Sequence, residues 1–193
     1  MVMSKKDLII TLPNEHLRQR SRRVALVNDE VRKVIDAMKA ATLDWEASRP
    51  HEVGVALAAI QIDKAYRIII IRNNFEDKKD KTFSVLINPE VVKLEGDIEE
   101  DYEGCLSVAD IYGKVLRHTK VRIRALDENG QPIRIRAEGF LARILQHEVD
   151  HTVGKMFVDH IKDKPDAFFK LTSEGKLVSL PYESLQKTGF FRD

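Results

Sequence analysis

The chain has 193 residues, which is long enough to bury most of its apolar surface in one hydrophobic core, so we expect a single domain. With 43% hydrophobic residues, 33% charged residues and a net charge of +1, it carries no general signal for DNA or for a membrane. The apolar stretch Leu8-Ile9-Ile10 is too short for a secretion signal or a membrane span. One cysteine excludes an intrachain disulfide and suits a reducing compartment, and we therefore expect a cytoplasmic protein.

Residues 8–23 are expected to form an extended basic arm with a turn at Pro13-Asn14. Its arginines are expected to be solvated: Arg18, Arg20, Arg22 and Arg23. An amphipathic helix should begin after Asn28 or Asp29, either of which can cap it, and end before residues 48–50. The apolar positions that predict this helix recur at helical spacing: Val31, Val34, Ile35, Met38, Thr42 and Trp45.

Two β-branched stretches, residues 67–72 and 83–89, predict strands, the second one ending at Asn88-Pro89. A charged loop should connect them, and the acidic segment 95–103 is expected to be mainly a solvated loop.

Residues 120–126 and 132–137 alternate apolar and basic side chains, which predicts two strands with their arginines on the solvent face. Between them, residues 127–131 contain Asn-Gly, a pair that readily takes the positive φ angles of a hairpin turn.

A second helix is predicted over residues 139–152, where apolar residues again recur at helical spacing, and Gly154 is a natural end for it. We assign residues 1–165 to one catalytic domain of a metal hydrolase. Residues 166–193 should extend the same domain, with a helix followed by a loose tail.

The second helix carries His147 and His151, four residues apart and therefore on the same helical face, where both imidazoles can bind one metal ion. Glu148 beside them can carry a proton, which makes this a His-Glu-x-x-His motif. Histidines also occur four apart by chance on surface helices, so the third ligand matters. Phe157 stands where a metzincin has its third histidine, and Asp159 or His160 would require an unusually short return of the chain.

Cys105 is the candidate third ligand from upstream, and Gly104 before it lets the backbone approach closely. A lone cysteine is often only a small buried apolar residue. A thiolate with two neutral imidazoles, however, makes a site with three protein ligands and an open fourth position, which is what metal catalysis requires.

Three segments together make the chain resemble the peptide deformylases. They are Gly-Val-Ala-Leu-Ala-Ala-Ile-Gln at residues 54–61, Glu-Gly-Cys-Leu-Ser at residues 103–107 and Gln-His-Glu-Val-Asp-His at residues 146–151. The resemblance covers roughly residues 8–160. It implies an α+β fold, in which antiparallel strands pack around a central helix that bears the His-Glu-x-x-His motif.

The resemblance implies that Cys105, His147 and His151 bind one divalent metal, Fe²⁺ in the cell, with Zn²⁺, Ni²⁺ or Co²⁺ also able to occupy the site. Glu148 would act as general acid and base, and Gln61 with the backbone N–H of Leu106 would bind the oxyanion. Residues implied to contact the substrate are Gly54, Val55, Ala56, Gly104 and Tyr112.

The chain departs from the family pattern at Ala56, which replaces a glycine beside the substrate and could narrow the cleft or forbid a positive φ angle. Glu103 could orient a metal ligand or simply end the acidic loop. Asp150 should face away from the metal, as a surface residue or as an ion-pair partner of Arg117 or Arg143. Three other histidines are read as surface or packing residues: His51, His118 and His160.

The first hypothesis is therefore a metal-dependent hydrolase that removes the formyl group from N-terminal formylmethionine of nascent polypeptides and releases formate. Its partners would be formylated N-termini, with a transient ribosome contact, and neither DNA nor a membrane. A second hypothesis is a related amidohydrolase with an altered range of N-acyl groups. A third is a weakly active homologue that binds nascent chains or ribosomes through its arginines, against which the intact Glu148 and Gln61 argue.

Overall fold

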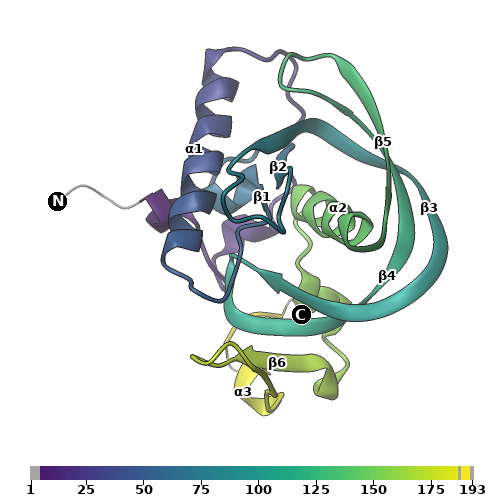
Figure 1. The fold of residues 1–193 in the computed structure, drawn as a ribbon. Coiled ribbons are helices and arrows are strands. Elements are labelled where there is room, and N and C mark those ends of the chain that lie inside the picture. Colours follow the sequence, from purple (N-terminus) through teal and green to yellow (C-terminus); the bar gives the residue numbers. More distant parts are fainter. Residues whose placement is uncertain (1–4, 187, 192–193) are drawn as a thin grey trace.

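The computed structural model describes residues 5–186 and 188–191, and its centre is an antiparallel sheet of seven strands. Six strands follow the order β1-β2-β3-β4-β6-β7, and β5 pairs with β4. Figure 1 shows the mixed helical and antiparallel architecture, which confirms the expected α+β class. The strands are β1 (Ala56–Ala58), β2 (Ile68–Arg72), β3 (Phe83–Cys105), β4 (Val108–Leu126), β5 (Pro132–Glu138), β6 (Phe168–Leu171) and β7 (Leu177–Ser179).

Helix α1 (Asp29–Ala47) lies on the outside of the molecule, beside β1 and β2 (Figure 1). The side chain of Asn28 accepts a hydrogen bond from the N–H of Val31 at 3.0 Å, as expected of a helix cap. The apolar stripe predicted from the sequence is buried against the sheet, where Met38 is fully buried. The position of the first predicted helix is therefore confirmed, and so are the cap and the apolar stripe from which it was predicted.

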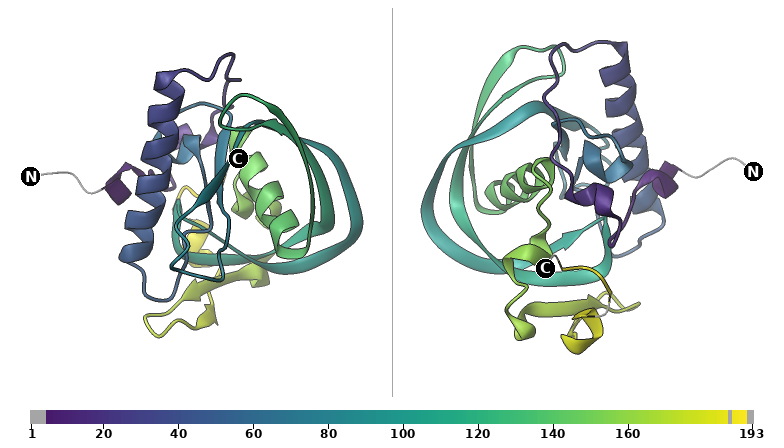
Figure 2. Two further views of the ribbon diagram at one scale, coloured as in Figure 1. Left: turned by 45° about the horizontal axis from the view of Figure 1, so that its top comes forward. Right: turned by 180° about the vertical axis from the view of Figure 1, so that it is seen from behind.

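Helix α2 (Gly139–Thr152) lies within the concave side of the curved strands β3, β4 and β5 (Figures 1 and 2). Its buried residues Ile144 and Leu145 belong to the same apolar cluster as Val121 and Ile123 of β4. The helix stops before Gly154, which has a φ angle of +76° and lies so close to the N-terminal arm that an added Cβ would be 2.2 Å from the carbonyl oxygen of Arg18. Only glycine fits there, and the predicted helix end is confirmed.

Strand β3 does not end at Asn88-Pro89, as the sequence had led us to expect. Asn88 takes a φ angle of +53°, and the pairing with β4 shifts between Ile87 and Glu90, so the strand passes Pro89 through a bulge. The acidic segment 95–103 is consequently part of a strand and not a loop. This correction matters for the site, because Glu103 at the end of that segment is buried.

The predicted hairpin of β4 and β5 is confirmed, with Arg124 opposite Arg134 and Arg122 opposite Arg136. In its turn Gly130 has a φ angle of +79°, whereas Asn129 does not take a positive φ angle. The exposed Arg124 is paired with Glu90, as its place on the solvent face suggests.

The segment after residue 165 begins with the end of a short 3₁₀ helix, η5 (Pro165–Ala167), and two strands follow it where an α-helix was expected. Strand β6 pairs with β4, where Lys170 lies opposite Ile111, and β7 forms a hairpin with β6. The short helix α3 (Glu183–Gln186) follows, and residues 187 and 192–193 of the expected tail lie outside the described residues. This segment thus continues the main sheet.

The N-terminal arm contains two short 3₁₀ helices, η1 (Lys5–Leu8) and η2 (Glu15–Arg18), and residues 1–4 are not described. Arg18 is not solvated, contrary to expectation, because its side chain pairs with Asp159 and donates to the carbonyl oxygen of Phe190 at 2.5 Å. Further 3₁₀ helices are η3 (Ala59–Ile62), η4 (Phe157–His160) and η5 (Pro165–Ala167). Among the described residues, no helix is both long and apolar enough to cross a membrane.

Candidate metal centre

The three predicted metal ligands come together from two elements. Cys105 ends β3 at the tight turn into β4, and His147 and His151 project from successive turns of α2. The Sγ atom of Cys105 lies 3.4 Å from Nε2 of His151, which in turn lies 3.1 Å from Nε2 of His147. One ligand atom from each residue falls within 4.8 Å of the others. One soft sulfur and two imidazole nitrogens converge on one point, a donor set that suits Zn²⁺ or Fe²⁺.

Glu103 contacts His147 at the ring nitrogen that is turned away from the other two candidate ligands. Its Oε2 atom lies 2.9 Å from Nδ1 of His147, which leaves Nε2 of that ring turned toward Cys105 and His151. Burial disfavours the charge of Glu103, but hydrogen bonds from His147 and Arg117 hold the pKa of this carboxyl well below its usual range. Of the two interpretations of Glu103, the structure supports the one in which it orients a metal ligand.

Glu148 lies beside the ligands in a different environment. Its side chain lines the same pocket as His147, and its Oε2 atom is buried without a hydrogen-bond partner among the described residues. Burial raises the pKa of Glu148 to about 7, the main cause being loss of solvation. A carboxyl group with a free oxygen and a pKa near neutrality is suited to take up and release a proton.

Gln61 approaches the centre from the other side, on η3 directly after β1. Its Oε1 atom accepts a hydrogen bond from the N–H of Ala58 at 2.8 Å, which fixes the amide. Its Nε2 atom therefore faces Ser107 Oγ at 3.1 Å and Cys105 Sγ at 3.4 Å. The resemblance implied that Gln61 binds the oxyanion, and the structure brings its donor group to the thiol of Cys105.

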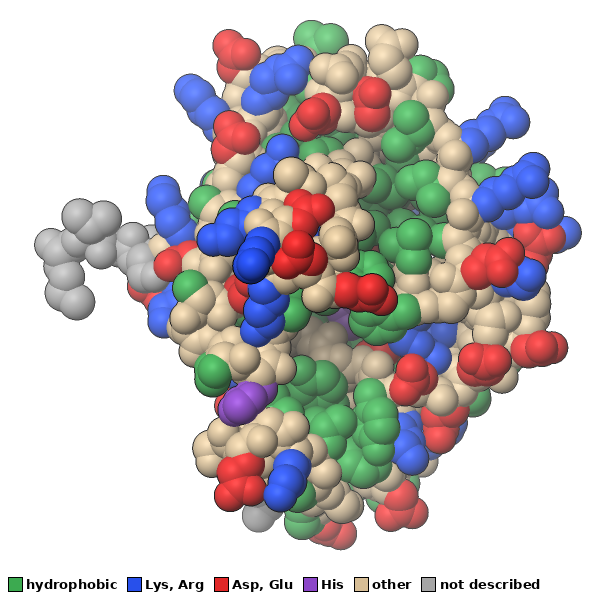
Figure 3. All heavy atoms as spheres, viewed as in Figure 1, with side chains coloured by type: hydrophobic (Ala, Val, Ile, Leu, Met, Phe, Trp, Pro, Cys, Tyr) green, Lys and Arg blue, Asp and Glu red, His purple; other side chains and the backbone are tan. Residues whose placement is uncertain are grey.

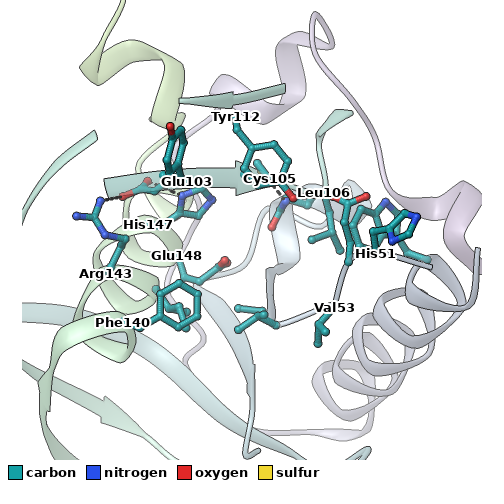
Figure 4. A pocket seen from close by; sticks show the side chains of 18 residues that line it. His51, Val53, Glu103, Cys105, Leu106, Tyr112, Phe140, Arg143, His147 and Glu148 are labelled. Atoms are coloured by element: carbon teal, nitrogen blue, oxygen red, sulfur yellow. Dashed lines mark hydrogen bonds and ion pairs between the residues drawn. The ribbon is translucent and has the colours of Figure 1, made fainter. Parts of the chain in front are cut away.

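A pocket of about 300 Å³ opens in front of these groups. Figure 3 shows it as a hollow with apolar side chains around it, and Figure 4 shows His147 and Glu148 at its wall. Leu106 lines it, as do four of the five predicted substrate contacts, which are Val55, Ala56, Gly104 and Tyr112.

Gly54, the fifth residue predicted to contact the substrate, does not line this pocket. An added Cβ would lie 2.6 Å from Cγ2 and 2.9 Å from the carbonyl oxygen of Thr42, so the glycine is required for close packing against α1. Its N–H donates to Glu46 at 3.0 Å. Ala56 is extended in β1 opposite Ile71, so the backbone there does not need the positive φ angle that an alanine would resist.

The rim of the pocket contains a contact that the sequence did not reveal. Tyr112 donates its hydroxyl to Glu52 at 2.8 Å, and Glu52 also accepts from Arg49 at 3.1 Å. Burial and the neighbouring Glu52 raise the pKa of Tyr112. Because Glu52 precedes β1 and Tyr112 belongs to β4, this hydrogen bond joins two walls of the pocket.

Phe140 and Arg143 also line the pocket and were missed as site residues. Phe140 is one of the apolar residues whose helical spacing predicted α2, but half of it is exposed, at 50%. The signal that could have identified Arg143 is its place one helical turn before His147 on an otherwise apolar side. Asp150 faces away from the ligands and pairs with Arg117 at 2.6 Å, which is one of its two predicted partners.

The chain was compared with known families and solved structures. A sequence profile described as polypeptide deformylase matches residues 6–166. A crystal structure of a peptide deformylase from Legionella pneumophila is 40% identical, with a TM-score of 0.69 over 79% of this chain and 83% of that one. The Synechococcus elongatus peptide deformylase in complex with actinonin is 36% identical, with a TM-score of 0.73 over 81% and 80%. A Plasmodium falciparum peptide deformylase is 32% identical, with a TM-score of 0.71 over 79% and 84%.

Proposed function

Because the chain belongs to the polypeptide deformylase family, we propose that it removes the formyl group from N-terminal formylmethionine of nascent polypeptides and releases formate. The observation that carries this proposal is the meeting of the Cys105, His147 and His151 ligand atoms beside a buried carboxyl oxygen of Glu148 that has no partner among the described residues. Together they supply a metal-binding group and a proton carrier at the wall of one pocket.

The residues fit one divalent metal ion, held by Cys105, His147 and His151. When bound, such an ion supplies Lewis acidity, which lowers the pKa of water and polarises a carbonyl group. We propose Fe²⁺ in the cell, with Zn²⁺, Ni²⁺ or Co²⁺ able to take its place. Glu103 supports this role, since its bond to Nδ1 of His147 directs the Nε2 atom toward the other two ligands.

Glu148 is the proposed general acid and base. Its free Oε2 atom accepts the proton of the attacking water, and the carboxyl group then donates a proton to the nitrogen of the leaving amine. The pKa of about 7 supports both steps, because neither the charged nor the neutral form is strongly favoured near neutral pH.

Gln61 and the backbone N–H of Leu106 are the proposed donors to the formyl oxygen as negative charge develops on it. The amide of Gln61 is held by its bond to Ala58, so its Nε2 group is fixed before the substrate arrives. Leu106 adjoins Cys105 in the turn between β3 and β4, and its side chain lines the pocket. Donors that are already oriented stabilise the transition state without the cost of reorganisation.

The proposed substrate is the formylated N-terminus of a polypeptide, lying in the pocket with its first side chain against apolar surface. Val55, Phe140 and Ile144 line the pocket together with His147 and provide this surface, which suits the unbranched side chain of methionine. We further propose transient contact with the ribosome, a cytoplasmic location, and no role for DNA or a membrane.

Formate release from formyl-Met-Ala by protein loaded with Fe²⁺ or Ni²⁺ tests the proposed function. Steady release that depends on the metal is the expected result. Protein that holds metal at the three ligands and yet releases no formate would refute it.

The same assay with acetyl-Met-Ala and longer acyl groups tests the alternative of an altered acyl range. We expect formyl to be preferred. The variant Ala56→Gly is the matched comparison, because it removes the one methyl group by which the pocket departs from the family pattern at that position.

A further inference from the structure

Arg143 is a charged residue on the side of α2 that faces the sheet, one helical turn before His147. It is 7% exposed and lies between Ala142 and Ile144, which are also buried. A buried guanidinium group is costly unless its donors are used, so its partners indicate what it does.

The partners of Arg143 come from both long strands, and one of them is the side chain of Glu103 on β3. Its Nη1 group donates to the carbonyl oxygen of Val115 on β4 at 2.7 Å and to Oε1 of Glu103 at 2.9 Å. Its Nη2 group donates to the carbonyl oxygen of Glu99 on β3 at 2.8 Å. The planar guanidinium therefore fastens α2 to β3 and β4 at the level of Glu103.

Each of the two oxygens of Glu103 has two partners. Its Oε1 atom accepts from Arg143 and from Nε of Arg117, the latter at 2.9 Å. Its Oε2 atom accepts from Nη2 of Arg117 at 3.1 Å and lies 2.9 Å from Nδ1 of His147. Figure 4 shows Arg143 joined to Glu103 beside His147.

Arg117 binds both oxygens of Glu103, through Nε and Nη2, and its remaining Nη1 group is anchored to Asp150 at 2.6 Å, a side chain that is partly exposed at 21%. Arg143 is instead held by backbone carbonyl groups of two paired strands, which cannot move independently of the sheet. Without Arg143, the Oε1 atom of Glu103 would keep one partner, Arg117, which also binds Asp150.

We propose that Arg143 is a positioning residue for the metal ligand His147, acting through Glu103. By fixing the carboxylate it fixes the direction of the bond to Nδ1, and so it aims Nε2 of His147 at the point where Cys105 and His151 meet. This inference rests on the metal centre of the proposed function, but it concerns metal affinity and does not depend on which acyl group is removed.

The experiment measures the dissociation constant for Zn²⁺ by competition with a chelating dye, together with the absorption spectrum of the Co²⁺-loaded protein. The variants are Arg143→Gln, which removes the charge and most donors, and Arg143→Lys, which restores the charge. Arg72→Gln is the matched control. Arg72 is also buried, at 1% exposed. It pairs with Glu46 and donates to the carbonyl oxygens of Asp80 at 2.6 Å and Lys78 at 3.0 Å, and Glu103 is not among these partners.

We expect Arg143→Gln to weaken Zn²⁺ binding by about 10-fold, at the low end of the effect of residues that orient metal ligands, and to shift the Co²⁺ spectrum. Arg143→Lys should recover part of the affinity, and Arg72→Gln should lower stability without changing Zn²⁺ affinity. In a Glu103→Gln background, Arg143→Gln should have no further effect on affinity, because the residue through which it acts has been altered.

The proposal would be overturned if folded Arg143→Gln bound Zn²⁺ with wild-type affinity. It would also be overturned if Arg143→Gln caused the same loss of Zn²⁺ affinity in the wild-type background and in the Glu103→Gln background. If Arg143→Gln does not fold, Arg143→Lys in the two backgrounds decides by the same criterion. Formate release by the wild-type protein tests the proposed function separately, so failure of one result leaves the other standing.

Discussion

Glu103 and Glu148 are two carboxyl groups on either side of the same histidine, and they differ in almost everything except burial. Glu103 is 5% exposed and Glu148 is 4% exposed. Glu103, on the sheet side of His147, is held by two arginines and the imidazole, and its pKa is lowered. Glu148, on the pocket side, has a buried oxygen without a partner among the residues described, and its pKa is raised.

The comparison teaches that partners, and not depth, decide what a buried carboxyl group can do. The sheet side of His147 supplies fixed charge and geometry. The pocket side supplies a group that can change its protonation state. Four substitutions test this division, from the largest expected effect to the smallest.

Glu148→Gln should lower kcat by about 10²- to 10⁴-fold, because the amide has nearly the same shape but cannot accept and return a proton. Metal content should stay at the wild-type level, since Glu148 is not one of the three converging ligands. Formate release and metal analysis on the same sample check both statements. A large loss of metal would place Glu148 on the structural side of the comparison and contradict the division.

Gln61→Ala should lower kcat by about 10²- to 10³-fold, as removal of one donor to an oxyanion typically does. Gln61 combines both kinds of environment, because its oxygen is fixed by Ala58 while its nitrogen faces the site. Steady-state kinetics with a formyl peptide measures the effect. Unchanged kcat with a raised KM would mean that Gln61 binds the ground state and not the developing charge.

Glu103→Gln should weaken Zn²⁺ binding by about 10- to 100-fold, because His147 loses its charged partner. It also leaves Arg117 and Arg143 buried with a neutral neighbour, so stability should fall, by as much as about 3 to 5 kcal/mol. Chelator competition and urea denaturation measure the two effects. Loss of kcat at full metal occupancy, with affinity unchanged, would be inconsistent with the assigned role.

Asp150→Asn should have the smallest effect, a loss of about 1 to 2 kcal/mol of stability. Asp150 accepts from Arg117 at 2.6 Å and lies 2.7 Å from Nε2 of His160, at the outer end of the same network. Its side chain is partly exposed, at 21%, so water can replace some of the lost bonds. Urea denaturation checks the stability, and Zn²⁺ affinity should remain within about twofold of wild type.

The group of Cys105, His147 and His151 that could hold a metal was predictable, because local rules govern it. Helical spacing put His147 and His151 on one face, and the elimination of downstream alternatives left Cys105. Helices α1 and α2 were likewise predictable from the spacing of their apolar residues, and the β4–β5 hairpin from its strand pattern and turn residues.

The surroundings of the site were less predictable, because tertiary contacts determine them. The turn signal of Asn88-Pro89 is genuine, but the Asn88 side chain bonds both the N–H and the carbonyl oxygen of Val24, each at 2.8 Å, and the bulge lets the strand continue. That continuation is what buries Glu103 at the end of an acidic stretch. Likewise, the sequence predicts that Arg18 is solvated, because its partner Asp159 is distant in the chain.

The turn at Cys105 has a further consequence, for folding. Cys105 and His151 are 46 positions apart in the chain, and they meet only when the β3–β4 hairpin has closed around α2. The three ligand atoms do not come together in an unfolded chain, so the complete site binds an ion only in the folded protein. Bound metal should therefore link the sheet to its enclosed helix and stabilise the folded state. The melting temperature should rise with metal concentration, because more of the protein then has metal bound.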